Sequence, residues 1–294
     1  MKIETTFIAD NSEWASQCSR QPDKLHFPIT ENPARILSNA WVNAEYKHMV
    51  VAGDAASLAA QPGQFFHLKC PGTEVDQPYL RRPMSLYGVN PSAGTVEFLY
   101  KVQGMGTRGL ATLAEGDCLD MLGPLGRGFE IPDTTRHVLM VARGVGLATL
   151  TPLASAAIAL GAKVTAMLSA RSPELIMSKE RLTGAGADVI AVSDTEGNSA
   201  VPELEALIRR LHAQTPVDFM TTCGSNRLLK LLQSLSKELG VTGQIAMEQH
   251  MGCAVGMCYA CVRPFRQSAD SEELSYRRVC WDGPVFPLEE ALTW

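Results

Sequence analysis

The sequence predicts a β plus α/β chain: an antiparallel β-barrel, then a Rossmann-like parallel α/β domain, then a small cysteine-bearing domain. Three observations predict it. Residues 34–132 contain short apolar runs broken by turns, and residues 133–247 alternate continuous apolar runs with helical segments. Four of the eight cysteines fall in residues 248–294. Residues 1–33 contain no glycine and show no sustained period, so they are predicted to be an N-terminal extension.

The composition is that of a globular protein and excludes several classes of partner. Of 294 residues, 46% are hydrophobic and 19% are charged. The net charge is -5 and no basic run is present, which argues against nucleic acid and anionic membranes as partners. The uncharged stretch 144–162 contains Pro152 and begins and ends near glycines, so it predicts a buried helix rather than a membrane span. The beginning of the sequence does not resemble a signal peptide, which predicts a cytoplasmic protein.

The barrel is expected from five short runs at turn-punctuated spacing, with one short helix over residues 107–116. The runs are HMVVAG, GQFFHLKC, RPMSLYGV, TVEFLYKV and CLDMLG.

The α/β domain is expected from apolar runs that alternate with helical patterns, which is typical of a parallel sheet. The runs are HVLMVA, KVTAMLSA, ADVIAVS, VDFMTTCG and QIAMEQ, and a helix is expected over residues 173–182 as well as in the other connections.

The cysteines of the C-terminal segment carry the strongest motif. Cys253, Cys258, Cys261 and Cys280 have the C-x4-C-x2-C…C spacing that holds a 2Fe–2S cluster in plant-type ferredoxins. Small residues next to the ligands let backbone N–H groups approach the sulfurs. Structural zinc is the alternative, although zinc sites usually have a C-x2-C pair at both ends and only one such pair is present. Unliganded thiols are the second alternative.

A second motif is Arg82-Pro83-Met84-Ser85. The arginine suits a diphosphate and the proline fixes the strand, so this tetrapeptide is a candidate flavin site. Taken alone it also fits an ordinary surface arginine. It gains weight from the glycine turn before Thr107, because a helix N-terminus binds phosphate.

A third motif follows the first α/β strand. Gly144 and Gly146 form a G-x-G turn at the start of a helix, which suits a dinucleotide pyrophosphate, although Thr149 replaces the third glycine. An ordinary strand–helix turn remains the alternative. Cys223 ends a later strand and is a candidate residue beside the nicotinamide; a buried packing cysteine is the other interpretation.

Taken in order, RPMS, YKVQGMGT, LGPLGRGF, RGVGLATL, TTCGS and the cysteine loop resemble the electron-transfer subunit of dihydroorotate dehydrogenase, a ferredoxin reductase-like family. The resemblance extends from about residue 35 to residue 283. It implies an FAD-binding barrel, an NAD(P)-binding α/β domain and a 2Fe–2S domain.

Position by position, the resemblance implies a set of cofactor contacts. The flavin-binding tetrapeptide is Arg82, Pro83, Met84 and Ser85, and Tyr100, Lys101 and Val102 are the strand segment whose backbone meets the flavin. Gly106 and Thr107 match the pair at the FAD pyrophosphate, and Cys253, Cys258, Cys261 and Cys280 match the cluster ligands.

Three departures from the family pattern stand out. Arg143 occupies a position that is normally glycine, Ala148-Thr149 replaces Pro-Pro, and the extension 1–33 has no counterpart in compact members. Arg171, after the second α/β strand, is a candidate contact for a 2′-phosphate, so NADP is not excluded.

The resemblance implies an oxidoreductase component that moves electrons between NAD(P)H, FAD, a 2Fe–2S cluster and a partner protein in a hetero-oligomer. The partner is expected to be a dihydroorotate dehydrogenase-like catalytic subunit, an oxygenase or another dehydrogenase. The competing hypothesis is a zinc-binding regulatory or structural protein with a decayed flavin site.

Overall fold

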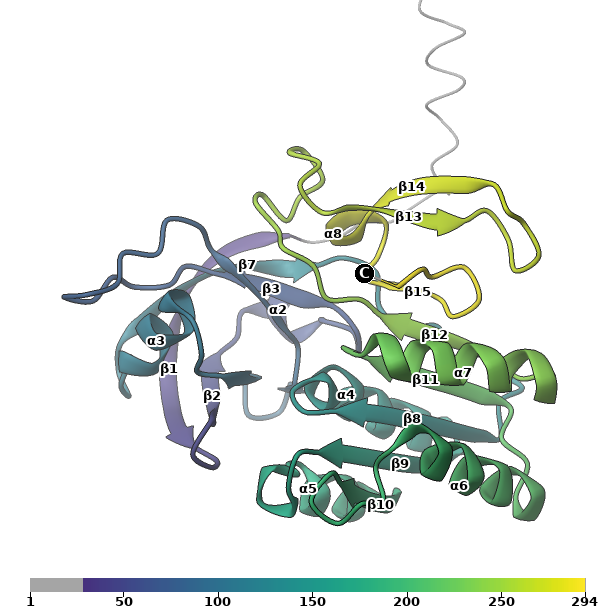
Figure 1. Cartoon of the computed structure of the whole chain (residues 1–294). Coiled ribbons are helices and arrows are strands. Elements are labelled where there is room, and N and C mark those ends of the chain that lie inside the picture. The colour runs from purple at the N-terminus through teal and green to yellow at the C-terminus, as the bar shows by residue number, and fades with distance from the viewer. Residues whose placement is uncertain (1–28, 294) are drawn as a thin grey trace, which may run out of the picture.

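A computed structural model describes residues 29–293 of the chain. Phe7, Trp14 and Phe27, the aromatic residues of the predicted extension, lie outside the described residues. Residues 30–33 of that predicted extension belong to the first strand of the barrel. The predicted fold class is confirmed, since an antiparallel barrel, a mostly parallel α/β sheet and a small C-terminal hairpin follow one another along the chain (Figure 1).

Within the described residues, seven antiparallel strands form the barrel in the order β4-β3-β7-β1-β2-β6-β5. β4 and β5 are neighbours in the chain but lie at opposite edges of this order, so the sheet has to curl. The edge-to-face pair of Phe66 and Phe98, with ring centroids 5.5 Å apart, fills its interior. The elements are β1 (Thr30–Trp41), β2 (Tyr46–Ala52), α2 (Ala55–Leu58), β3 (Phe65–Leu68), β4 (Arg82–Ser85), β5 (Gly88–Asn90), β6 (Thr95–Lys101), α3 (Met105–Thr112) and β7 (Cys118–Leu125).

The α/β sheet has the order β10-β9-β8-β11-β12-β15, with parallel pairing up to β12. The strands directly after β8 are added towards one edge of the sheet and β11 and β12 towards the other, so the strand order reverses between β8 and β11. Such switch points bind ligands at the carboxyl ends of the strands. The elements are β8 (His137–Arg143), α4 (Gly146–Ala159), β9 (Lys163–Ala170), η1 (Pro173–Leu175), α5 (Lys179–Ala185), β10 (Asp188–Ser193), α6 (Val201–Gln214), β11 (Phe219–Cys223), α7 (Asn226–Leu239) and β12 (Thr242–Ala246).

Helices cover both faces of this sheet. Along β8, Leu139 and Val141 pack with α6 and α7, while Val138, Met140 and Ala142 pack with α4 and α5. Burial on both faces explains why the strand is a continuous apolar run in the sequence.

The helix predicted over residues 173–182 is divided in the structure. A 3-10 turn, η1, is followed by α5, and Ser178 between them has φ 61°, in the left-handed region. A residue in this conformation cannot continue a right-handed helix, and the helical pattern of the sequence does not reveal it.

The C-terminal segment contributes to two sheets. β13 (Val262–Arg266) and β14 (Leu274–Arg278) form a hairpin, followed by α8 (Val279–Asp282). β15 (Val285–Pro287) then joins β12 as an antiparallel edge strand of the α/β sheet. The hairpin is fixed to that strand by Phe265 and Phe286, whose ring centroids are 4.2 Å apart.

Candidate functional site

The predicted flavin strand is β4, at the edge of the barrel. An edge strand tolerates Pro83, which lacks a backbone donor. All four residues of β4 are half-buried. The Arg82 side chain lies against the first turn of α3, because a Cβ added at Gly106 would be 2.8 Å from Arg82 Nε. The structure thus brings together two residues that the sequence assigned separately to one diphosphate.

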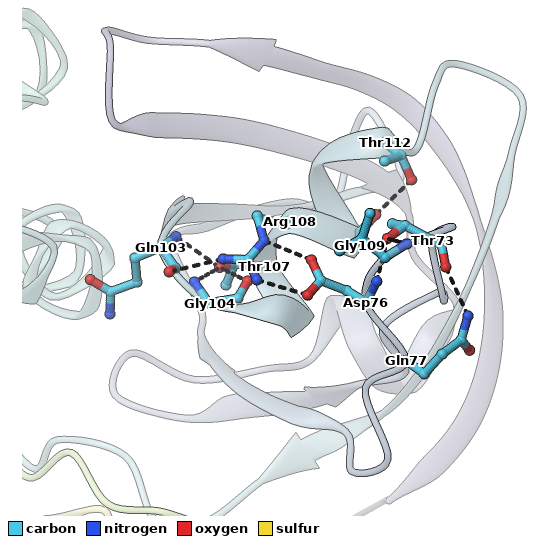
Figure 2. A network of polar contacts seen from close by, with 10 residues as sticks. Thr73, Asp76, Gln77, Gln103, Gly104, Thr107, Arg108, Gly109 and Thr112 are labelled. Carbon is cyan, nitrogen blue, oxygen red and sulfur yellow. Dashed lines mark hydrogen bonds and ion pairs between the residues drawn. The ribbon is translucent and has the colours of Figure 1, made fainter.

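Polar contacts fix the N-terminus of α3 (Figure 2). Thr107 Oγ1 accepts hydrogen bonds from the backbone N–H groups of Gln103 (3.0 Å) and Gly104 (3.1 Å). Arg108 forms a two-point ion pair with Asp76, at 2.6 and 2.8 Å, which ties the helix to the loop between β3 and β4. The first turn of α3 contains no acidic residue, so its positive end is available to a phosphate.

The strand segment predicted to meet the flavin has inward-facing and outward-facing side chains. Tyr100 is buried, which raises its pKa, and its hydroxyl donates to Asn39 Oδ1 at 2.8 Å. Asn39 in turn donates to the carbonyls of Leu110 and Leu113 at the end of α3, so Tyr100 holds the helix in place. Lys101 pairs with Glu45 at 2.9 Å. The Val102 N–H donates to the Glu45 carbonyl at 2.9 Å. The Tyr100 side chain therefore supports the helix and does not face a ligand.

The glycine turn after β8 lies at the switch point and faces the barrel. Gly144 has φ +56°, and a Cβ there would be 3.4 Å from the Tyr46 hydroxyl of β2. A Cβ on Gly146 would be 2.6 Å from the carbonyl oxygen of Cys223, so only glycine allows α4 to start this close to β11. The predicted nucleotide turn and strand β2 of the barrel therefore lie side by side.

Cys223 ends β11 next to Gly146 and is buried, with 2% of its surface exposed. Its Sγ lies 3.6 Å from Thr149 Oγ1. Burial, and then the nearby Glu248 carboxylate, raises the pKa of the thiol to about 12. At neutral pH it is a neutral thiol that fits packing or hydrogen bonding, and it does not fit a nucleophile or base.

The four C-terminal cysteines lie in two couples. Met257 and Cys258 donate their backbone N–H groups to Cys253 Sγ, at 3.2 and 3.3 Å. Cys261 Sγ and Cys280 Sγ are 3.2 Å apart, and the Cys280 N–H donates to Cys261 Sγ at 3.4 Å. The contact between the two sulfurs is the main cause that lowers the pKa of Cys261 to about 6, and the same contact raises the pKa of Cys280. The backbone N–H groups that donate to Cys253 and Cys261 stabilise thiolates, the form that binds metal.

The backbone of the cysteine loop is shaped around its sulfurs. Ala254 (φ 59°), Gly256 (φ 78°) and Tyr259 (φ 58°) lie in the left-handed region. A Cβ on Gly252 would be 3.1 Å from Cys258 Sγ, so the absence of a side chain there leaves room beside the sulfur. Three left-handed residues, two of them not glycine, are a departure from ordinary loop geometry that is typical of ligand sites.

The arrangement of the four cysteines fits the iron–sulfur hypothesis. A 2Fe–2S cluster needs two thiolates on each iron, and the couples Cys253–Cys258 and Cys261–Cys280 fit that requirement.

A groove of about 620 Å³ borders the cysteine loop. Arg278 pairs with Asp282, and Arg277 pairs with Glu290 at 2.6 Å. Arg127 Nε is buried and makes no hydrogen bond to the described residues. Sequence reasoning did not single out this groove, because its walls come from the barrel, the hairpin and the cysteine loop. It is lined by Arg127, Tyr259, Val262, Tyr276, Arg277, Arg278 and Asp282.

Sequence reasoning also missed Asp194, which follows β10 and forms an ion pair with Arg143. Arg171, the sequence candidate for a 2′-phosphate, instead pairs with Glu45 of the barrel. In the part of the chain that the structure describes, no helix is long and apolar enough to cross a membrane.

Comparisons with known proteins agree with this geometry. A family model described as the iron-sulfur cluster binding domain of dihydroorotate dehydrogenase B matches residues 248–292. Relatives from Bacillus cereus (strain Q1) and Bacillus anthracis (strain A0248) are named dihydroorotate dehydrogenase B (NAD(+)), electron transfer subunit. Each is 32% identical to this chain over 247 residues, which cover 83% of this chain and 92% of the relative.

Solved structures show the same fold. The NADH-dependent reduced ferredoxin-NADP oxidoreductase, studied for flavin-based electron bifurcation, aligns with a TM-score of 0.73 at 27% identity, covering 88% of this chain and 89% of that one. The ferredoxin-NADP+ reductase of Plasmodium falciparum aligns with a TM-score of 0.56 at 11% identity, covering 75% of this chain and 97% of that one. The second likeness concerns the fold alone.

Proposed function

The chain belongs to the family of the dihydroorotate dehydrogenase B electron transfer subunits, and from that membership we propose that it links a nicotinamide nucleotide to a partner oxidoreductase. It does so as a subunit that binds FAD on its barrel, NAD(H) on its α/β sheet and a 2Fe–2S cluster at its C-terminus. The single observation that carries the proposal is the arrangement of the four cysteines as two couples next to the barrel.

Different residues of the chain bind FAD and the nicotinamide nucleotide. Arg82 and the N-terminus of α3 hold the FAD diphosphate, and the backbone of residues 100–102 meets the flavin. Gly144 and Gly146 let a nucleotide approach the switch point across from the barrel. Cys223 packs behind that turn as a neutral, buried thiol. When bound, the flavin supplies the conversion between a hydride pair and single electrons, which a cluster alone cannot perform.

Electrons leave the chain for the partner through the cysteine loop. Tyr259, between two of the cluster ligands, is 64% exposed and Met257 is 78% exposed, so the loop lies at the surface. Tyrosine, methionine and arginine are enriched at protein interfaces. Tyrosines and arginines line the groove, and the exposed Met257 belongs to the cysteine loop beside it. The partner is a catalytic subunit of the dihydroorotate dehydrogenase type, bound on this face in a hetero-oligomer.

The proposal includes a cytoplasmic location. Cluster assembly requires Cys253, Cys258, Cys261 and Cys280 as reduced thiols, and the cytosol keeps thiols reduced.

Anaerobic reduction of the purified protein tests the proposal. The protein should be yellow-brown, with FAD and two iron atoms per chain, and NADH should bleach the flavin and then the cluster. Addition of the same organism's dihydroorotate dehydrogenase catalytic subunit should couple oxidation of dihydroorotate to reduction of NAD+. A colourless protein that contains zinc would contradict the cofactor assignment, and a coloured protein that does not couple would contradict the partner.

A further inference from the structure

The Arg143 side chain crosses the carboxyl ends of three neighbouring strands. At the end of β8, its Nη1 donates to Ser169 Oγ (2.9 Å) and to Asp194 Oδ1 (3.1 Å), and its Nη2 donates to Asp194 Oδ2 (2.6 Å). Ser169 lies at the end of β9 and Asp194 directly follows β10. A two-point ion pair of this kind fixes both the guanidinium and the carboxylate in orientation.

Asp194 is held from other sides as well. The Ser199 hydroxyl donates to it, and Arg227, at the start of α7, is close enough to act on its charge. Hydrogen bonding by Arg143 is the main cause that lowers the pKa of Asp194 to about 2. The carboxylate is therefore an ionised acceptor between two arginines at any physiological pH.

This ion pair lies next to the nucleotide turn. Gly144 and Gly146 mark the switch point between β8 and β11, and the ion pair extends from the same turn towards β9 and β10. In dinucleotide-binding sheets an acidic side chain about 20 residues after the glycine turn accepts hydrogen bonds from the ribose hydroxyls of NAD, whereas an arginine accommodates the 2′-phosphate of NADP. Asp194 lies farther along the chain, after β10, and is joined to the turn by Arg143. Arg143 and Asp194 place an arginine and an acid side by side, and the ion pair between them engages the guanidinium of Arg143.

We infer that Asp194 selects NADH over NADPH, and that its ion pair withholds Arg143 from a 2′-phosphate. The inference rests on the proposed function and assigns the residues that set its preference for NAD(H). The unaltered protein prefers NADH because a 2′-phosphate would have to approach a carboxylate. Removal of the carboxylate charge would release the Arg143 guanidinium, next to the glycine turn, to pair with a 2′-phosphate.

Arg171 does not take this role in the structure. The guanidinium pairs with Glu45 of the barrel, and Glu45 is also bound by Lys101. Arg171→Ala is therefore a control that removes an arginine near the site without touching the Arg143–Asp194 ion pair.

The test measures binding of NAD+ and NADP+ to the holoprotein by calorimetry, together with flavin reduction by NADH and NADPH. Asp194→Asn should tighten NADP+ binding by roughly 10- to 100-fold, the contribution of a charge-assisted hydrogen bond. The double variant R143A/D194N should lose that gain, and Arg171→Ala should leave the ratio of the two affinities unchanged. Unaltered FAD and iron content in each variant checks that the fold is retained.

Each contrary result has a distinct meaning. An unchanged NAD+/NADP+ ratio in Asp194→Asn, or a gain that persists in the double variant, overturns this inference and leaves the proposed function standing. A changed ratio in Arg171→Ala overturns it in favour of Arg171. If the unaltered holoprotein binds neither nucleotide, both the inference and the proposed function fail.

Discussion

Cys258 is the most exposed of the four cysteines that are proposed to hold the cluster. Cys258→Ser should lose the iron and the visible iron–sulfur absorption but keep FAD, because the flavin residues lie on a separate element. Iron analysis and absorbance spectra check this result. Cys118→Ser is the matched control, since Cys118 is also exposed but lies on β7. Full iron content in Cys258→Ser would contradict the ligand assignment.

Arg82 contributes through one contact with a charged ligand. Arg82→Ala should weaken FAD binding by about 1.5–3 kcal/mol, the contribution of a hydrogen bond to a charged group. The measurement is the dissociation constant of FAD from the deflavinated protein. Arg35→Ala, at an exposed position on β1, should leave that constant unchanged. Equal FAD affinity in both variants would make Arg82 an ordinary surface arginine.

At the scale of elements, one polar cluster joins the barrel to the α/β domain. Arg181 of α5 forms a two-point ion pair with Glu97 of β6, at 2.6 and 3.2 Å, and stacks over the Tyr87 ring at 4.4 Å. His48 also contacts Glu97, at 2.8 Å, and the Tyr87 hydroxyl lies 2.7 Å from Ser178 Oγ. These contacts fix α5 against β6 and against Tyr87, which lies between β4 and β5.

Glu97 makes this contact sensitive to acid. Burial by itself raises the pKa of Glu97, but hydrogen bonds from His48 and Arg181 outweigh it and lower the pKa from its ordinary value of 4.5 to about 2. A carboxyl whose pKa is lower in the folded state stabilises the fold above its unfolded pKa, and the contribution disappears as pH falls through the folded value. The sensitive window is therefore between about pH 4.5 and pH 2.

Chemical denaturation across that window provides the test. Glu97→Gln should unfold more easily than the unaltered protein at pH 7, and the two should converge as the pH falls towards 2. Glu74→Gln, an exposed carboxyl in the loop between β3 and β4, should follow the unaltered protein at every pH. A constant difference between Glu97→Gln and the unaltered protein down to pH 2 would show that the charge of Glu97 does not stabilise the interface.

At the scale of the whole molecule, the groove beside the cluster lies where a partner has to approach. Arg127→Glu should weaken association with the catalytic subunit, because it reverses a charge whose Nε makes no hydrogen bond to the described residues. The dissociation constant at low and high salt measures this effect, and reduction of the cluster by NADH within the chain should be unaffected. Association as strong as that of the unaltered chain would place the interface elsewhere.

The sequence by itself determined the fold class and the iron–sulfur motif. Continuous apolar runs such as HVLMVA report burial on both faces of a sheet, and the spacing of Cys253, Cys258 and Cys261 is local along the chain. These features depend on neighbours in the sequence, and periodicity and spacing record them directly. The division of residues 173–182 was missed because the left-handed Ser178 leaves no mark in the helical pattern.

Only the tertiary structure decided which distant residues meet. It placed the Arg82 side chain against Gly106 and added β15 to the α/β sheet. It also paired Arg143 with Asp194, and Arg171 with Glu45. Each of these contacts joins residues that are far apart in the chain or on different elements, so no local pattern encodes it. Whether an arginine of this protein meets a phosphate or a carboxylate depends on packing that brings strand ends together, and the order of residues in one segment does not specify that packing.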